Sequence, residues 1–137
     1  MATFHLEVVS LDGREFDGEV TRVMLRTIDG DVAILARHTN YCSAIAMGTA
    51  HVYLPDDTVR TAACIGGMIT MLDNKCSVLP TTWEWSDQID VDRAKAAKET
   101  AEKRLADEGL SKEERVRAEA KLYRALVRIS AAGSAKA

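Results

Sequence analysis

The spacing of hydrophobic and polar positions divides this chain into two parts with different periods. Up to about Trp85, apolar and polar residues alternate, as in FHLEVVS, where Phe4, Leu6 and Val8 fall on one face of a strand. Turn-forming residues such as Asp29-Gly30 interrupt the alternation roughly every eight to twelve residues. Many short strands at this spacing favour an antiparallel sandwich or a flattened barrel.

Two glycines and a proline also predict strand ends in this first part. The run TVRTAACI ends at Gly66-Gly67, and the run KCSVL ends at Pro80. Because the glycines lie between strands and do not precede a helix, they indicate a turn or bulge and not a phosphate-binding loop. Trp83 and Trp85 flank Glu84 at the end of this part, and we interpret both rings as packing at the junction with the second part.

After Trp85 the apolar period changes to 3.6, which is typical of helices. Asp90 is a candidate N-cap, and Glu108-Gly109 can end the first helix. Its predicted inner face consists of Val91, Ala94, Ala101 and Leu105.

A second helix starts directly after this end. Ser111 and Glu114 have the spacing of a capping box, and the helical pattern continues to about Ala131. Two helices joined by a tight turn form an antiparallel hairpin. Because the first helix is rich in alanine, it buries little apolar area, so we expect a modestly stable hairpin that can dock in more than one place. The residues of the second helix predicted to pack inward are Leu122, Ala125, Leu126 and Ile129.

These patterns predict an α+β chain with two domains. Residues 1–87 form a flattened antiparallel β-sandwich, and residues 88–137 form an α-helical hairpin. The apolar residues, 47% of the total, occur in short runs, whereas a membrane-spanning helix requires about 18 consecutive ones. No N-terminal export signal is recognisable, so we expect a cytoplasmic chain without direct membrane insertion.

Cysteine and histidine give no sign of a metal site. The chain has three of each, widely spaced, and lacks HxxxH, HExxH and CxxC spacings. We interpret Cys42, Cys64 and Cys76 as small hydrophobic residues in a reduced compartment.

The net charge of −3 is unevenly distributed. Residues 1–89 contain 6 Lys and Arg against 12 Asp and Glu, whereas residues 90–137 contain 12 against 9. A chain that is acidic at the front and basic at the back indicates two surfaces with different partners.

Four cations of the second helix form a basic stripe. Each residue turns a helix by about 100°, which places all four within about 60° of one another. A solvated face is the plain interpretation, and an anionic partner is the alternative that this segregation favours. The acidic front half argues against nucleic acid, and the alanine-rich first helix argues against a membrane surface. An acidic protein segment and a nucleotide remain. The basic stripe consists of Arg117, Lys121, Arg124 and Arg128.

Several short motifs occur together in a recognisable order. They are the Phe16-Asp17-Gly18 turn, the Gly30-Asp31 step before an apolar strand, His38, Gly66-Gly67 and the segment Ile89-Asp90-Val91-Asp92-Arg93-Ala94. In this order the chain resembles the epsilon-subunit family of the bacterial F-type ATP synthase over essentially its full length. It departs from the family at ILARHTNY, where the family often has prolines.

The resemblance implies a fold and a set of partners. The fold is a sandwich of about ten strands followed by a two-helix hairpin. The sandwich would bind the gamma subunit and the c-ring and couple rotation to the catalytic head, as a peripheral subunit at the cytoplasmic face of the cell inner membrane. The coupling ion would be a proton or sodium. The extended hairpin would meet the beta and alpha subunits with its basic stripe and inhibit ATP hydrolysis.

The resemblance also implies a regulatory ligand, because some family members bind ATP, with or without Mg, on the folded hairpin. In this chain Arg124 and Arg128 match the arginines that contact phosphate. Carboxylates and guanidinium groups suit an exocyclic amine and phosphate oxygens, respectively. The residues that match the whole ATP site are Glu84, Ile89, Asp90, Arg93, Ala94, Arg124 and Arg128.

Two alternatives belong to other functional classes. An independent enzyme lacks support, because the sequence has no GxxxxGK[ST] loop and no nucleophile elbow. We therefore expect no catalytic residues and no required cofactor. A free-standing nucleotide-sensing regulatory module is the second alternative, and it would need no rotor partner.

Overall fold

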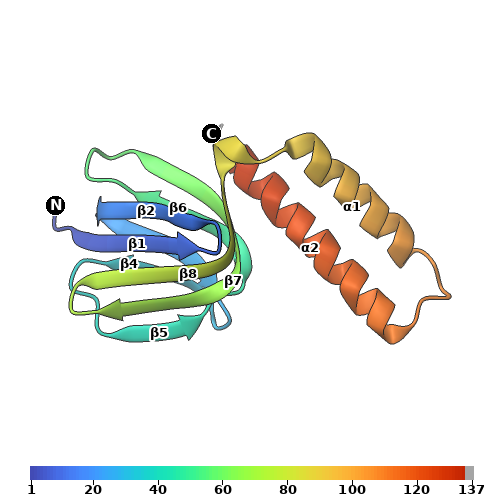
Figure 1. Ribbon diagram of the computed structural model, residues 1–137, viewed down its shortest axis with the longest axis horizontal. Coiled ribbons are helices and arrows are strands. Elements are labelled where there is room, and N and C mark those ends of the chain that lie inside the picture. Colours follow the sequence, from blue (N-terminus) through green and yellow to red (C-terminus); the bar gives the residue numbers. More distant parts are fainter. Residues whose placement is uncertain (135–137) are drawn as a thin grey trace.

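The computed structural model describes residues 1–134, which form a β domain followed by a two-helix hairpin (Figure 1). The strands are β1 (Phe4–Ser10), β2 (Gly13–Val20), β3 (Arg22–Thr27), β4 (Gly30–Leu35), β5 (Tyr41–Ala44), β6 (Met47–Tyr53), β7 (Val59–Leu72) and β8 (Lys75–Trp85). A short 3₁₀ helix, η1 (Ser86–Gln88), leads to α1 (Val91–Leu105) and α2 (Lys112–Ser134).

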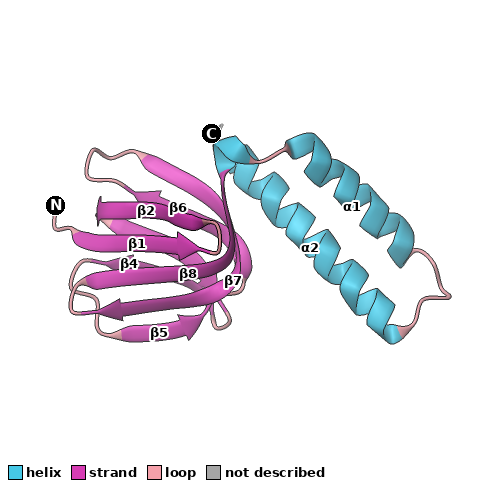
Figure 2. Cartoon of the chain, viewed as in Figure 1, coloured by secondary structure: helices cyan, strands magenta, loops and turns pink. Residues whose placement is uncertain are grey.

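The strands form one sheet that curls round on itself into a sandwich (Figure 2). The strand order is β2-β1-β8-β7-β6-β3-β4, and β5 also pairs with β7. The β1–β8 pair is parallel, and the other pairs are antiparallel. The first half of β7 pairs with β6 and its second half with β5, so this long strand links both layers.

Eight strands occur where the sequence suggested about ten, because two predicted breaks are absent. Strand β7 runs through Gly66-Gly67, and β8 runs through Pro80, with their pairing register unchanged. Gly67 has a φ of 114°, and a Cβ built on it would lie 2.2 Å from the Leu79 carbonyl oxygen. Glycine therefore lets the two strands bend together without ending, and counting each half separately gives the larger number.

The sandwich has one hydrophobic core, built from the inward positions of the alternating strands. Phe4, Leu6 and Val8 of β1 are all buried, as their alternation predicted. Trp83 and Trp85 belong to the same core, and their rings meet edge to face with centroids 5.2 Å apart. Their role is therefore packing within the sandwich, immediately before the chain leaves it.

The hairpin begins with the predicted caps but turns earlier than expected. Asp90 caps α1, and the Ser111 hydroxyl accepts a 3.1 Å hydrogen bond from the Glu114 N–H of α2. Helix α1 ends at Leu105 and not at Glu108-Gly109. The Arg115 guanidinium donates to the Leu105 carbonyl, which satisfies a helix-end acceptor before the glycine is reached.

Helix α2 buries two different faces, and this corrects the predicted inner face. Ala118 and Ala125 are buried beside α1, whereas Val127 and Ala131 join a cluster with Ala63 of β7. Leu126, expected to pack inward, is 42% exposed. Leu122 and Ile129 are half-buried. A single helical wheel assumes one partner, whereas α2 packs against both α1 and the sandwich.

The apolar contact between the hairpin and the sandwich is a small cluster. Ile89, Val127, Ala131 and Ala132 form the buried cluster with Ala63, and Met47 and Val91 pack against it. Neither helix of the described part of the chain is long and apolar enough to span a membrane.

Candidate functional site

A groove of about 620 Å³ lies along the two helices where they meet the end of β8. Its floor is formed by alanines of both helices, and charged side chains form its rim. The lining residues that carry charge are Glu84, Asp90, Arg93, Arg104, Lys121, Arg124 and Arg128, and the alanines are Ala94, Ala97, Ala101, Ala118 and Ala125.

The structure brings six of the seven predicted ATP-site residues to this groove. They come from three elements: Glu84 from β8, the residues of the Asp90 motif from the start of α1, and Arg124 and Arg128 from α2. Ile89 is the exception. It is 8% exposed and packs in the cluster with Val127 and Ala131. Because Ile89 precedes the helix, it does not share the face of the residues that follow the cap.

Asp90 has a structural role within this site. Its Oδ1 accepts a 3.1 Å hydrogen bond from the Arg93 N–H, and its backbone carbonyl accepts from the Ala94 N–H at 3.0 Å. The side chain is exposed and lines the groove, and a carboxylate has a second oxygen besides the one that caps the helix. Capping and ligand binding can therefore use different oxygens of the same group.

Arg128 and Glu84 form a direct polar link between α2 and the sandwich. The Arg128 Nε lies 2.5 Å from the Glu84 Oε1, and the two side chains are 31% and 33% exposed. Glu84 points outward because it alternates with the buried Trp83 and Trp85 along β8. A ligand phosphate at Arg128 would have to share this guanidinium with Glu84 or displace the carboxylate.

The structure divides the basic stripe. Lys121, Arg124 and Arg128 line the groove, whereas Arg117 does not. Arg104 of α1 lines it as well, although it is not among the site residues that the sequence predicts. Arg104 follows Arg93 by eleven positions, about three helical turns, so the period of α1 could have identified it. Its guanidinium also contacts the Glu114 carboxylate at 3.5 Å.

The groove is electropositive, with five cationic side chains facing two carboxylates. Arg93, Lys121 and Arg124 form no ion pair within residues 1–134. Guanidinium groups around an alanine floor suit an anion that also carries a flat apolar part. Phosphate or carboxylate recognition is the chemistry that this arrangement supports best.

The tightest group of candidate metal ligands within residues 1–134 lies elsewhere, on the outer face of β1 and β2. It consists of His5, Glu7 and Asp17, and Asp17 contacts the His5 ring at 2.6 Å and the Arg14 guanidinium at 3.1 Å. Arg14 also approaches Glu7 at 4.0 Å. A guanidinium thus already supplies the positive charge that these carboxylates face.

The cysteines are free thiols, and two of them are core residues. Burial raises the pKa of the Cys64 and Cys76 thiols to about 12, so both are protonated and apolar at neutral pH. Cys42 is exposed on β5. The interpretation of Cys64 and Cys76 as small hydrophobic residues is confirmed.

Family models match both parts of the chain. Residues 3–86 match the β-sandwich domain of the ATP synthase delta/epsilon chain, and residues 87–133 match the long α-helix domain of the same chain. These two matches cover nearly all of the described residues.

Curated relatives and a solved structure agree with these models. The chain is 40% identical to the ATP synthase epsilon chain of Caldicellulosiruptor bescii over 96% of this chain and 95% of that one. It is 36% identical to the sodium ion specific ATP synthase epsilon chain of Acetobacterium woodii over 77% and 80%, respectively. Its fold matches a chain in the cryo-EM structure of the Euglena gracilis mitochondrial ATP synthase, comprising OSCP, F1 and c-ring, with a TM-score of 0.84 at 19% identity. That match covers 96% of this chain and 82% of the other.

Both relatives are named as the epsilon chain of an ATP synthase. The chain belongs to the delta/epsilon chain family of the ATP synthases, among the bacterial epsilon chains.

Proposed function

We propose that this chain is a central-stalk subunit of a proton- or sodium-translocating F-type ATP synthase. Its sandwich binds the gamma subunit and the c-ring and couples their rotation to the catalytic head. Its hairpin regulates ATP hydrolysis by the complex, which lies at the cytoplasmic face of the cell inner membrane. The relatives named ATP synthase epsilon chain and the match to a chain within an F1 and c-ring assembly support this proposal.

The observation that carries the regulatory part is the electropositive groove between the helices and β8. ATP, with or without Mg, is the ligand that fits this chemistry. Arg124 and Arg128 would contact the phosphates, and the Asp90 carboxylate would accept from the adenine amine. Because the groove draws on both helices and on β8, a bound nucleotide stabilises only the docked hairpin.

The weak attachment of the hairpin makes a second arrangement accessible. A small apolar cluster and partly exposed polar contacts such as that of Arg128 with Glu84 hold α2 on the sandwich, and both kinds of contact contribute little free energy individually. Once released, the basic stripe can reach an acidic segment of the beta or alpha subunit. Since the same cations serve both arrangements, ATP and those subunits compete for them.

Calorimetric titration of the isolated chain with ATP tests the ligand. We expect Arg124→Ala and Arg128→Ala each to weaken binding about tenfold or more, because each removes a charge-assisted hydrogen bond. Arg117→Ala is the matched control, since Arg117 lies on the same helix outside the groove, and it should change affinity by less than about threefold. Equal losses in all three variants would indicate general charge attraction and contradict a built site.

ATP hydrolysis by the reconstituted complex tests the inhibitory role. Replacing Arg117, Lys121, Arg124 and Arg128 together by alanine should raise the hydrolysis rate, and higher ionic strength should reproduce part of this rise because it screens exposed charges. An unchanged hydrolysis rate would indicate that the basic stripe is only a solvated face without an inhibitory role. ATP binding without any affinity for gamma would instead identify a free-standing nucleotide sensor.

A further inference from the structure

A second groove, of about 430 Å³, runs along the opposite flank of α2, over the outer face of β3, β4 and β6. Met24, Met47, Leu126 and Val127 give it an apolar middle. Arg26, Asp31 and Tyr123 line it as well, and Arg26 and Tyr123 also line an adjoining hollow. None of these residues lines the electropositive groove.

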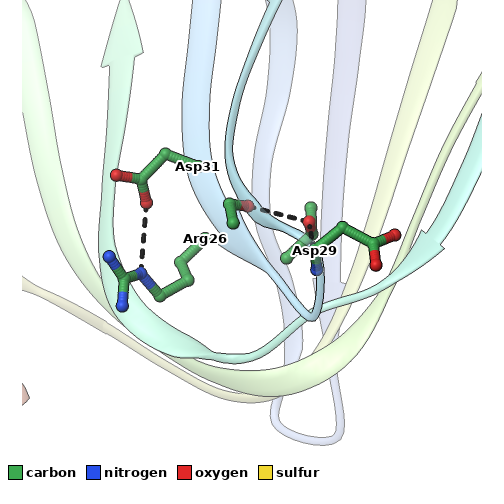
Figure 3. Close-up of polar contacts among 5 residues, drawn as sticks. Arg26, Asp29 and Asp31 are labelled. Atoms are coloured by element: carbon green, nitrogen blue, oxygen red, sulfur yellow. Dashed lines mark hydrogen bonds and ion pairs between the residues drawn. The ribbon is translucent and has the colours of Figure 1, made fainter.

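The sandwich holds Arg26 in a fixed place on this flank. Arg26 of β3 lies directly opposite Asp31 of β4 in the strand register, and its Nε donates a 3.2 Å hydrogen bond to the Asp31 Oδ1 (Figure 3). The stem of Arg26 passes over Gly48 of β6, where a Cβ would approach the Arg26 Cβ to 2.8 Å. A larger residue at position 48 would therefore displace the arginine.

Two hydrogen bonds also fix the turn between β3 and β4, which directly precedes Asp31. The Thr27 hydroxyl accepts from the Asp29 N–H at 3.1 Å and donates to the Gly30 carbonyl at 2.8 Å. Figure 3 shows this turn beside the ion pair of Arg26 and Asp31. The ion pair thus presents a positioned guanidinium towards α2.

Tyr123 is the α2 residue that lines both the second groove and the adjoining hollow together with Arg26. The Asp31 hydrogen bond and charge raise the pKa of Arg26, and nearby Tyr123 adds to that rise. Tyr123 and Arg128 are five residues apart, which is about 140° around the helix. Polar side chains of α2 therefore lie near the sandwich on two different flanks.

We infer that Tyr123, Arg26 and Asp31 form a clasp that holds the hairpin on the sandwich independently of the nucleotide groove. This inference rests on the proposed function, in which the hairpin leaves the sandwich. The clasp would shift the equilibrium between the docked and the released hairpin towards the docked form. Because only the docked hairpin completes the groove, the clasp also sets apparent nucleotide affinity without touching the ligand.

Hydrogen exchange of the α2 amides in the isolated full-length chain measures the opening of the docked hairpin, even when the open form is rare. Tyr123→Phe removes one hydroxyl and keeps the ring, and Arg26→Met keeps the stem and removes the guanidinium. Each substitution should raise the equilibrium constant for opening, measured at the α2 amides, about two- to fivefold. This change corresponds to the free energy that an exposed polar pair typically contributes. The β8 amides report on the sandwich and should not change.

Two matched controls isolate the clasp. Arg22, on the same strand, stacks on the Tyr53 ring at 4.0 Å and lines neither groove. Arg22→Met and Tyr53→Phe should therefore leave α2 exchange unchanged. The double variant of Arg26→Met and Tyr123→Phe should show less than the product of the single effects, because both remove the same contact.

The outcomes separate the clasp from the proposed function. Unchanged α2 exchange in Tyr123→Phe and Arg26→Met, or equal changes in the controls, overturns the clasp whether or not ATP binds. Raised exchange establishes it even when titration finds no ATP binding, a result that would contradict only the nucleotide part of the proposed function.

Discussion

At the scale of single residues, Gly67 allows β7 and β8 to bend without separating. Its φ is positive, and backbone atoms of Leu79 and Pro80 occupy the space of a side chain. Gly30 has a similar φ of 113° but open space around it. Alanine substitutions at Gly30 and Gly67 therefore distinguish the cost of backbone strain from the cost of steric crowding.

We expect Gly30→Ala to lower the free energy of unfolding by about 1–2 kcal/mol through strain alone. Gly67→Ala should cost about 1–3 kcal/mol more, because the strands must move apart to admit the methyl group. Denaturant unfolding of both variants measures the difference. Equal costs would show that the contact with Leu79 relaxes without loss.

Asp90 combines a helix cap with a position in the groove, and two substitutions separate these roles. Asp90→Ala should destabilise the hairpin by about 1 kcal/mol, since the Arg93 N–H loses its acceptor. Asp90→Asn should retain the cap. Thermal melting of helical circular dichroism measures the cap, and calorimetry with ATP measures the groove. A loss of helix stability in Asp90→Asn equal to that in Asp90→Ala would contradict the capping role.

At the scale of elements, the two helices approach closely because alanines separate them. Ala101 is 4% exposed and lines the groove floor, whereas Ala96 of the same helix is exposed. Ala101→Leu should destabilise the hairpin by about 1–3 kcal/mol through overpacking. Ala96→Leu should change stability by less than about 0.5 kcal/mol. Helix amide exchange provides the measurement, and a neutral Ala101→Leu would show that the seam is loosely packed.

Helical periodicity predicted the two helices but not all of their faces. The caps at Asp90 and Ser111 are local signals, because each depends on a side chain and an N–H three residues later. Leu126 was misplaced because its surroundings are set by which strands lie below α2. The spacing of apolar residues identifies the apolar face of a helix but does not reveal that the helix packs against two neighbours.

At the scale of the whole molecule, the division into residues 1–87 and 88–137 stays a prediction. Within residues 1–134, the sandwich core draws on residues of strands β1 to β8 and of the loops between them, and the hairpin adds a separate cluster around Ala63. Truncation after Asp87 should therefore leave a sandwich that unfolds cooperatively and binds gamma. Calorimetric melting and a gamma binding assay check this expectation. Loss of cooperative unfolding would show that the hairpin completes the sandwich core.

The sequence by itself determined the class of fold, the period change near Trp85, the helix caps and the basic character of α2. These features depend on local propensity and on the alternation of buried and exposed positions, which are encoded over short stretches. The order of short motifs also predicted the family, and the comparisons confirmed it.

Only the tertiary structure decided which charges share a groove. Glu84 and Arg128 are 44 positions apart, and their contact depends on where α2 docks against β8. Docking also separates Arg117 from the other three cations and brings Tyr123 to Arg26 on the opposite flank. A helical wheel places side chains around one axis, whereas these contacts depend on the position of that axis relative to the sheet.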